Sequence, residues 1–287
     1  MMEVRRQYHT GKGILYMTNT GHTRQRSKVQ RVAHRGGSHL APENTMAAFR
    51  TALTLPIDAI ECDVQMSRDG HAIIFHDYTV ERLTDGEGNI LDLDFATLRS
   101  LNAAAHFREG WPQTQKIPTL QEVLKFAKGR TNVYIEIKFA QRDGAYSRYP
   151  NIAETVVQEV RAANMLDKVL IISFDWPMLV QIKSLEPLLQ TGAIVSSRQW
   201  KPETDDTQGV EQAAEILVSQ LASLHVDWMN LDKDLFSEMM LAVVHQHHLK
   251  LGLWTVNTLE ELQRFADAGV DSLTSDRPDL FAELQER

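Results

Sequence analysis

The chain has 287 residues, enough for one large α/β domain, since single barrels of alternating strands and helices run to about 250 residues. Its 30 basic and 38 acidic residues give a formal net charge of −8, which argues against nucleic acid as the main partner, because nucleic-acid binders usually present a basic face. The single cysteine, Cys62, excludes an intramolecular disulfide and a zinc site built on several thiolates.

The first 28 residues are basic, with six Arg and Lys residues and only Glu3 as an acid. Their longest apolar run, Ile14–Met17, is much shorter than the core of a secretory signal, which has about 7–15 apolar residues. No apolar run in the whole chain approaches the roughly 18 residues of a membrane-spanning helix. We therefore expect residues 1–28 to be a poorly ordered basic extension of a cytoplasmic protein whose main domain covers residues 29–287.

From residue 29 onwards, short apolar runs alternate with segments of helical periodicity. Asn44 is a plausible N-cap of the first helix, and Thr119 caps a later one with Glu122 at the third helical position. Between residues 78 and 118, turn residues replace the apolar pattern, apart from a short helix at 95–101. We expect strands at 29–34, 59–66 (with a second run at 71–75), 133–139, 169–173, 192–196, 226–231, 251–256 and 270–274. We expect helices at 45–55, 120–127, 152–162, 176–184, 209–224, 235–247, 259–268 and 278–285.

Eight strands, each followed by a helix, imply parallel pairing with right-handed crossovers. An open doubly wound sheet usually carries a glycine-rich phosphate loop after its first strand, whereas this chain has His34-Arg35-Gly36-Gly37 there. The pattern therefore predicts a (β/α)₈ TIM barrel. The irregular segment predicts a small insertion after the second strand, at about residues 77–118.

Chemically capable residues lie where the first two strands end. His34 and Arg35 close the first strand, and His76 closes the second run after strand two. Glu61 and Asp63 alternate with apolar residues and therefore project from one face of strand two. Two carboxylates held side by side repel each other unless a cation lies between them or one of them binds a proton.

Three further candidates lie on other strands. Glu136 and Lys138 share one face of the third strand, and Trp254 lies near the end of the seventh. Because barrel active sites lie at the C-terminal ends of the strands, all of these side chains can meet on one rim. Trp254 has two open roles, since it can stack on a substrate or cover the end of the barrel.

The residue types indicate a reaction. The carboxylates Glu61, Asp63 and Glu136 offer hard oxygen ligands for Mg²⁺ or Ca²⁺, with Mn²⁺ as a further possibility. Arg35 and Lys138 can hold an anionic group. Two histidines can act as general acid and base near neutral pH. Together these groups point to attack on a phosphodiester.

Structural interpretations stay open for the same residues. Glu61 and Asp63 can instead form ion pairs with Arg35 or Lys138, and such networks also perturb pKa values. His76 with Asp77 can be a helix-capping pair, Asn257 and Asp276 are expected to fix loops, and Glu43 with Asn44 to cap a helix. Cys62, on the opposite face of its strand from Glu61, is expected to be an inert core thiol.

Several spaced motifs closely resemble the glycerophosphodiester phosphodiesterase family. They are H-R-G at 34–36, P-E-N-T at 42–45, E-C-D at 61–63, H-D at 76–77, I-P-T-L at 117–120, E-I-K at 136–138, W-T-V-N at 254–257 and T-S-D-R-P at 274–278. The resemblance implies a TIM barrel with a small insertion, a divalent metal, and hydrolysis of glycerophosphodiesters to sn-glycerol 3-phosphate and an alcohol.

The resemblance also implies roles for individual residues. His34 and His76 match the acid/base pair, Arg35 and Lys138 the phosphate contacts, and Glu61, Asp63 and Glu136 the metal ligands. Two alternatives remain at this point. A lysophospholipase D-type hydrolase would need an apolar lip, which Phe107, Trp111 and Trp200 can supply unless they pack the insertion onto the barrel. A scaffolding barrel with a degenerate site is disfavoured, because no candidate ligand or histidine is missing.

Overall fold

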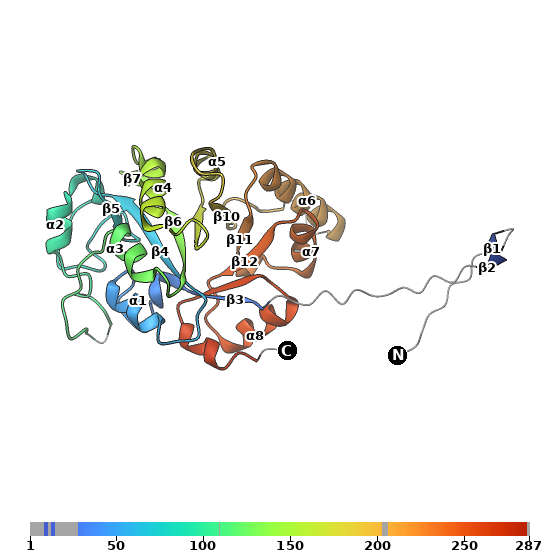
Figure 1. Cartoon of the computed structure of the whole chain (residues 1–287), viewed down its shortest axis with the longest axis horizontal. Helices are drawn as coiled ribbons and strands as arrows, with labels where there is room; N and C mark the ends of the chain where they lie inside the picture. The colour runs from blue at the N-terminus through green and yellow to red at the C-terminus, as the bar shows by residue number, and fades with distance from the viewer. Residues whose placement is uncertain (1–8, 11–12, 15–27, 109, 203–205, 286–287) are drawn as a thin grey trace.

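A closed barrel of parallel strands forms the centre of the computed structural model, which describes residues 9–10, 13–14, 28–108, 110–202 and 206–285 (Figure 1). Among these residues eight strands pair in parallel, and β3 pairs with both β13 and β4, which closes the barrel and confirms the predicted fold. The strands are β3 (Gln30–Ala33), β4 (Ala59–Met66), β6 (Asn132–Ile137), β9 (Val169–Ser173), β10 (Gln190–Val195), β11 (Trp228–Asp232), β12 (Lys250–Trp254) and β13 (Ser272–Ser275).

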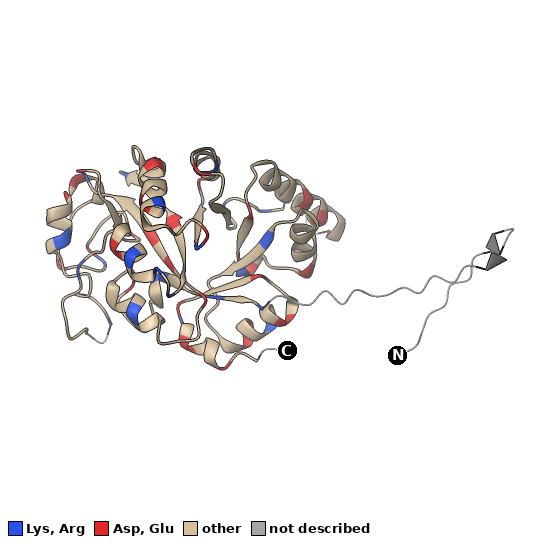
Figure 2. Cartoon of the chain, viewed as in Figure 1, with Lys and Arg blue, Asp and Glu red and all other residues tan. Residues whose placement is uncertain are grey.

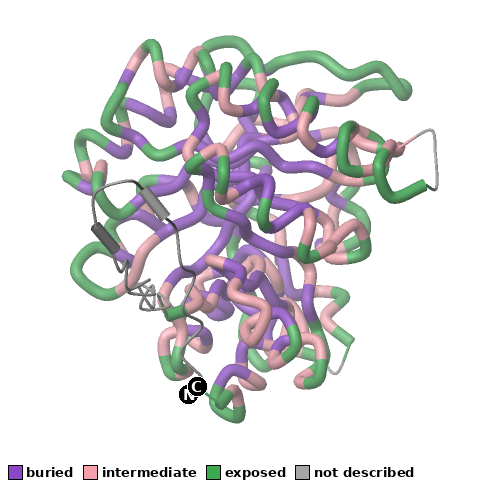
Figure 3. Tube along the Cα trace, turned by 90° about the vertical axis from the view of Figure 1, so that its right-hand side faces the viewer, coloured by how far each residue is buried: buried purple, intermediate pink, exposed green. Residues whose placement is uncertain are grey.

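Helices connect consecutive strands and cover the outside of the barrel (Figure 1). The buried residues gather in the interior of the molecule, as Figure 3 shows. A small apolar cluster that includes Tyr134, Ile194 and Trp228 fills the barrel interior, and a larger one lies between strands and helices. Burying one such side chain contributes about 1.5–3 kcal/mol, which makes these two clusters the main source of stability. The connecting helices are α1 (Met46–Ala52), α3 (Leu120–Ala127), α4 (Ile152–Ala163), α5 (Trp176–Leu185), α6 (Thr207–Ser223), α7 (Glu238–Gln246) and α8 (Leu259–Ala268).

Cys62 belongs to the larger cluster and is fully buried, as expected of a core thiol. Burial raises its pKa well above the ordinary value, and the charges of Glu61 and Asp63 add to the effect. A thiol held in its protonated form is a poor nucleophile.

Side-chain caps set where the helices begin. The predicted capping box of α3 is present, because Thr119 accepts from the backbone N–H of Glu122 and the Glu122 carboxylate accepts from that of Thr119. A cap of this kind contributes about 1 kcal/mol. The prediction for the first helix was wrong: Thr45, and not Asn44, caps α1 by accepting from the backbone N–H of Ala48.

The run after β4 turns back instead of continuing the strand. β5 (Ala72–Ile74) pairs antiparallel with β4, with Ile74 opposite Val64. This hairpin brings the residues after β5 back to the middle of β4, where Phe75 donates from its backbone to the carbonyl of Asp63. The hairpin explains how His76 reaches the C-terminal part of the barrel.

The segment between β5 and α3 contains the 3₁₀ helix η2 (Ile90–Asp92) and α2 (Phe95–Ser100). A cluster of its own apolar side chains, including Val80, Ile90 and Leu98, packs against Ile73 and Phe75 of the hairpin. This segment lies where the sequence predicts an insertion.

Three features differ from the sequence prediction or lie outside it. Strands β7 (Ala140–Arg142) and β8 (Ala145–Ser147) form an antiparallel hairpin after β6 that was not predicted. The chain ends in a 3₁₀ helix, η4 (Pro278–Ala282), and not in the predicted helix at 278–285. Most of the predicted basic extension lies outside the described residues, which contribute there only Lys28 and the two-residue strands β1 (His9–Thr10) and β2 (Gly13–Ile14).

Basic and acidic residues are interspersed over the helices that face the viewer in Figure 2. None of the helices in the described ranges is long and apolar enough to cross a membrane.

Candidate active site

A tight turn after β3 presents the first two candidate residues. His34, Arg35 and Gly36 form the 3₁₀ helix η1 (His34–Gly36), and Arg35 has a φ of 51°. Gly36 has a φ of 79°, and a Cβ there would lie 2.8 Å from the Cβ of Ala48 in α1, so only glycine fits. The turn is therefore pressed against α1, and the Arg35 backbone N–H donates to Glu61 Oε2 over 2.8 Å.

Three carboxylates meet on the neighbouring strands. Asp63 of β4 lies opposite Glu136 of β6, and Glu61 projects from the same face of β4. One oxygen from each lies within 4.8 Å of the others, and Glu61 and Asp63 are almost completely buried. Glu61 Oε1 and Asp63 Oδ1 are buried oxygens without a hydrogen-bond donor among the described residues.

The two carboxylates on β4 have opposite pKa shifts. Burial raises the pKa of Glu61 well above its ordinary value, with further increases from the charges of Asp63 and Glu136. Burial also acts to raise the pKa of Asp63, but the positive charges of Lys138 and Arg35 outweigh it and hold that pKa below the ordinary range. The repulsion expected between adjacent carboxylates therefore shows mainly as a raised pKa of Glu61.

Two cations contact this cluster, as the ion-pair interpretation requires. Lys138 Nζ lies 2.8 Å from Glu136 Oε1 and 3.5 Å from Asp63 Oδ1. Arg35 Nε lies 3.3 Å from Asp63 Oδ2. These contacts leave Glu61 Oε1 without a partner in the described chain, and its carboxyl group is the one with the raised pKa. Lys138 and Arg35 therefore do not fully neutralise the negative charge of the three carboxylates.

The residues present fit a divalent ion. The carboxylates Glu61, Asp63 and Glu136 supply hard oxygen ligands of the kind that Mg²⁺ and Ca²⁺ prefer. A cation would satisfy the orphaned oxygens and relieve the repulsion on Glu61.

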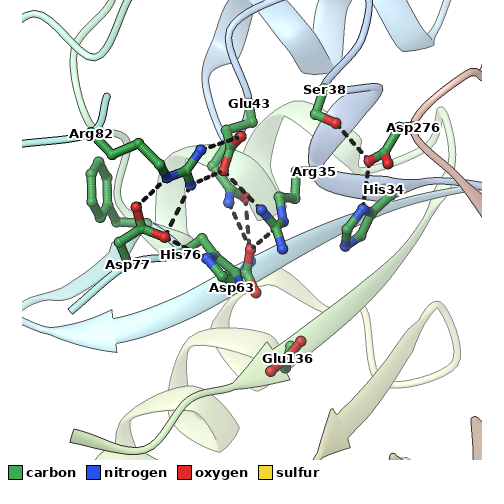
Figure 4. A network of polar contacts seen from close by, with 12 residues as sticks. His34, Arg35, Ser38, Glu43, Asp63, His76, Asp77, Arg82, Glu136 and Asp276 are labelled. Carbon is green, nitrogen blue, oxygen red and sulfur yellow. Dashed lines mark hydrogen bonds and ion pairs between the residues drawn. The ribbon is translucent and has the colours of Figure 1, made fainter. Parts of the chain in front are cut away.

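Each histidine is held by an aspartate. His34 Nδ1 lies 2.7 Å from Asp276 Oδ1, and His76 Nδ1 lies 2.7 Å from Asp77 Oδ1 (Figure 4). A carboxylate only accepts, so Nδ1 carries a proton in both rings, and whenever a ring is neutral its Nε2 is the basic nitrogen. His34 Nε2 points towards the carboxylate cluster, 3.9 Å from Glu61 Oε2.

Both aspartates are held as anions. Burial acts to raise the pKa of Asp276, but the hydrogen bond and charge of His34 reverse the shift, helped by hydrogen bonds from Ser38 and Asn257. For Asp77, the hydrogen bonds from His76 and Arg82 likewise outweigh burial and lower the pKa. Asp77 is therefore the partner of His76 itself, and the helix-capping interpretation of this pair was wrong.

Arg82 bridges two acidic residues of the site, Asp77 and Glu43. It donates to Asp77 and also to both carboxylate oxygens of Glu43, and Glu43 accepts from Arg35 over 2.9 Å (Figure 4). Asn44 donates to Asp63 Oδ2 over 2.7 Å, which replaces its predicted role as a helix cap. Arg82, which no sequence motif predicts as a site residue, thereby links Asp77, the partner of His76, to Glu43, the partner of Arg35.

The predicted site residues converge on one cavity of about 260 Å³. Asp63 is fully buried beneath it, and the other seven predicted residues line it: His34, Arg35, Glu61, His76, Glu136, Lys138 and Trp254. Trp254 donates from its indole N–H to the backbone carbonyl of Asn230 over 3.0 Å and packs edge-to-face on Phe174. It forms an apolar wall of the cavity, a position compatible with both roles left open by the sequence.

The match to known proteins is specific. The family model described as the glycerophosphoryl diester phosphodiesterase family matches residues 34–280. The chain belongs to this family. The prediction of a phosphodiesterase is thereby confirmed, since the motifs that carry the resemblance all lie within the matched range.

Individual relatives agree along nearly the whole chain. A glycerophosphodiester phosphodiesterase of Caldanaerobacter subterraneus subsp. tengcongensis is 33% identical over 254 residues, which cover 88% of this chain and 96% of the relative. Its counterpart in Bacillus subtilis is 30% identical over 271 residues, which cover 90% and 87%. The structure of an Oleispira antarctica phosphodiesterase in complex with the product sn-glycerol-3-phosphate superposes with a TM-score of 0.70 at 26% identity, covering 88% of this chain and 95% of that one.

Proposed function

We propose that this chain hydrolyses glycerophosphodiesters to sn-glycerol 3-phosphate and an alcohol, and that it needs a divalent metal ion. One observation carries the proposal: two aspartate-held histidines, three carboxylates and two cations surround a single cavity of about 260 Å³. The names of the relatives and the product bound by the Oleispira antarctica enzyme support the substrate class.

Glu61, Asp63 and Glu136 would hold the metal ion. When bound, the ion supplies Lewis-acid stabilisation of the negative charge that develops on the phosphoryl oxygens. Arg35 and Lys138 add positive charge at the same end of the cavity, because both are held in their charged form by the neighbouring carboxylates.

His34 and His76 would perform the proton transfers. One imidazole accepts at Nε2 a proton of the attacking water as the water oxygen forms the new P–O bond. The other ring starts as the imidazolium and donates its Nε2 proton to the leaving oxygen as the old P–O bond breaks, so that the product leaves as a neutral alcohol. Asp276 and Asp77 hold the rings in the orientation that this exchange requires.

The lysophospholipid alternative is not favoured, because the named relatives are glycerophosphodiester phosphodiesterases. Of the aromatic side chains that it would use, Trp200 packs against the core between strands and helices. Phe107 and Trp111 pack edge-to-face on each other with ring centroids 5.5 Å apart, and Phe107 also lines a cavity beside Glu43 and Arg82. The cytoplasmic location and the lack of a nucleic-acid partner stay predictions from the sequence.

The proposal is tested by measuring sn-glycerol 3-phosphate release from glycerophosphocholine, with lysophosphatidylcholine assayed in parallel for choline. The full-length protein is treated with EDTA, dialysed, and supplied in turn with Mg²⁺, Ca²⁺ and Mn²⁺. We expect loss of sn-glycerol 3-phosphate release with EDTA and its recovery with at least one ion. Full activity in EDTA contradicts the metal requirement, and choline released only from the lysolipid contradicts the substrate class.

A further inference from the structure

Asn230 is a buried amide of the cavity that the proposed chemistry does not use. It lies on β11, is 5% exposed, and lines the cavity together with the predicted site residues. Its Nδ2 is buried and has no hydrogen-bond acceptor among the described residues. Native proteins rarely leave such a donor unsatisfied, so the missing acceptor points to a ligand.

The neighbouring strands make room for this amide but supply no acceptor for its Nδ2 among the described residues. A Cβ on Gly192 of β10 would lie 2.4 Å from Asn230 Nδ2, and one on Gly252 of β12 would lie 2.8 Å from Oδ1. Any larger residue at either position would collide with the Asn230 side chain. The backbone of Asn230 is fixed as well, because its carbonyl accepts from the Trp254 indole.

The position of Asn230 in the barrel indicates which part of a substrate it meets. The three carboxylates and the two cations come from β4, β6 and the turn after β3, which are neighbours in the sheet. Asn230 comes from β11, and the apolar lining residues Ile172, Ile194 and Trp254 come from β9, β10 and β12 around it. The positive charges attract the phosphoryl group to the side of the cavity formed by β4, β6 and the turn after β3. The opposite side, formed by β9 to β12, therefore faces the organic part of the phosphodiester.

We propose that Asn230 determines specificity by donating a hydrogen bond from Nδ2 to a hydroxyl group of the glycerol moiety. The inference rests on the proposed function, since it assigns one contact to that substrate. A polyol suits this side of the cavity, because its C–H groups can pack on the apolar side chains while one hydroxyl accepts a hydrogen bond from Asn230 Nδ2. A hydroxyl both donates and accepts, so it can pair with either atom of the amide.

Two ligands that differ only in their hydroxyl groups test the contact: sn-glycerol 3-phosphate and n-propyl phosphate. Their affinities for the Mg²⁺-loaded full-length protein are measured by titration calorimetry. We expect wild type to bind sn-glycerol 3-phosphate at least about 10-fold more tightly, as one well-made buried hydrogen bond allows. Equal affinities for the two ligands in wild type would overturn the inference without any variant.

The variants Asn230→Ala and Asn230→Leu, the second of which keeps the volume, extend the test. Both should bind sn-glycerol 3-phosphate about 10-fold more weakly and n-propyl phosphate within about twofold of wild type. The matched control is Ser272→Ala, because Ser272 is also a fully buried polar residue, lies next to Gly252, and does not line the cavity. The control should leave both affinities unchanged.

The outcomes separate the two proposals. If wild type releases no sn-glycerol 3-phosphate from glycerophosphocholine, the proposed function fails. If wild type is active but the Asn230 variants weaken both ligands equally, or neither, the specificity role of Asn230 fails while the proposed function stands.

Discussion

Replacing Asp276 by Asn tests whether the carboxylate behind His34 acts in catalysis. Asp276 follows β13 directly, and its Oδ1 accepts from His34 Nδ1 over 2.7 Å and from Ser38 over 2.6 Å. Its Oδ2 accepts from Asn257 over 2.8 Å, so the side chain is held from three sides. Asparagine keeps the shape but loses the charge, and its NH₂ group can turn towards His34 and favour the wrong tautomer.

The size of the effect follows from electrostatics. An imidazolium and a carboxylate whose charges lie about 4 Å apart attract by about 4 kcal/mol at an effective dielectric constant of about 20. That energy is lost when the ring carries a positive charge during proton transfer, and it corresponds to a factor of about 10³ in rate. We expect Asp276→Asn to lower kcat by about 10²–10⁴, the range found when a histidine loses its orienting carboxylate.

The same strand offers a matched control. Asp271 precedes β13 and contacts His245 Nε2 over 2.8 Å, so an aspartate–histidine pair lies beyond each end of β13, and only the Asp276 pair belongs to the candidate site. Asp271→Asn should change the melting temperature but leave kcat for glycerophosphocholine within about twofold. Near-normal kcat in Asp276→Asn, or equal losses in the two variants, would show that Asp276 does not act through His34 in catalysis.

Three further predictions concern the two histidines, one proposed metal ligand and a partly buried glutamate on α4. His34→Ala and His76→Ala should each lower kcat by about 10²–10⁴ while circular dichroism shows an intact fold, and near wild-type turnover removes that histidine from the mechanism. Glu61→Gln should raise the metal concentration needed for half-maximal activity, and an unchanged metal titration rejects Glu61 as a ligand. Burial raises the pKa of Glu159, on α4, to about 7 from 4.5, with His71 opposing the shift. The stability from its bound proton is therefore complete below about pH 4.5 and lost as the pH rises through 7. Relative to Glu159→Gln, wild type should lose about 1–2 kcal/mol of unfolding free energy between pH 5 and pH 8, after allowance for solvent exposure, and parallel urea-denaturation profiles would contradict this.

The site residues that lie on strands could be predicted from the sequence, because the alternation of side chains along a strand is a local pattern. Alternation along β4 is enough to place Glu61 and Asp63 on one face and Cys62 on the other. The barrel rule then gathers the residues at the strand ends, such as His34 and Lys138, into one cavity.

The aspartates that hold the two histidines could not be predicted from local sequence patterns in this way. Asp276 is 242 residues from His34 in sequence, and the two meet only because β13 pairs with β3 to close the barrel. Its expected role, fixing a loop, is only part of what it does. Asp77 lies directly after His76, but nothing local indicates that its carboxylate turns back to the ring and not to a helix end.

Short hairpins were also missed, and one of them carries a signal. Asp143 and Gly144 both have positive φ between β7 and β8, and the pair Asp-Gly is a strong indicator of a two-residue hairpin turn. The strands on either side have only three residues each, too few for a periodicity to stand out.

We propose that one cavity holds both a divalent ion and the glycerol phosphate product. The most direct test is a crystal structure of the protein with Mn²⁺ and sn-glycerol 3-phosphate, with the ion located by its anomalous signal. We expect the ion in contact with Glu61, Asp63 and Glu136, and the phosphate beside it within reach of Arg35 and Lys138. An ion bound elsewhere, or a product outside this cavity, would contradict it.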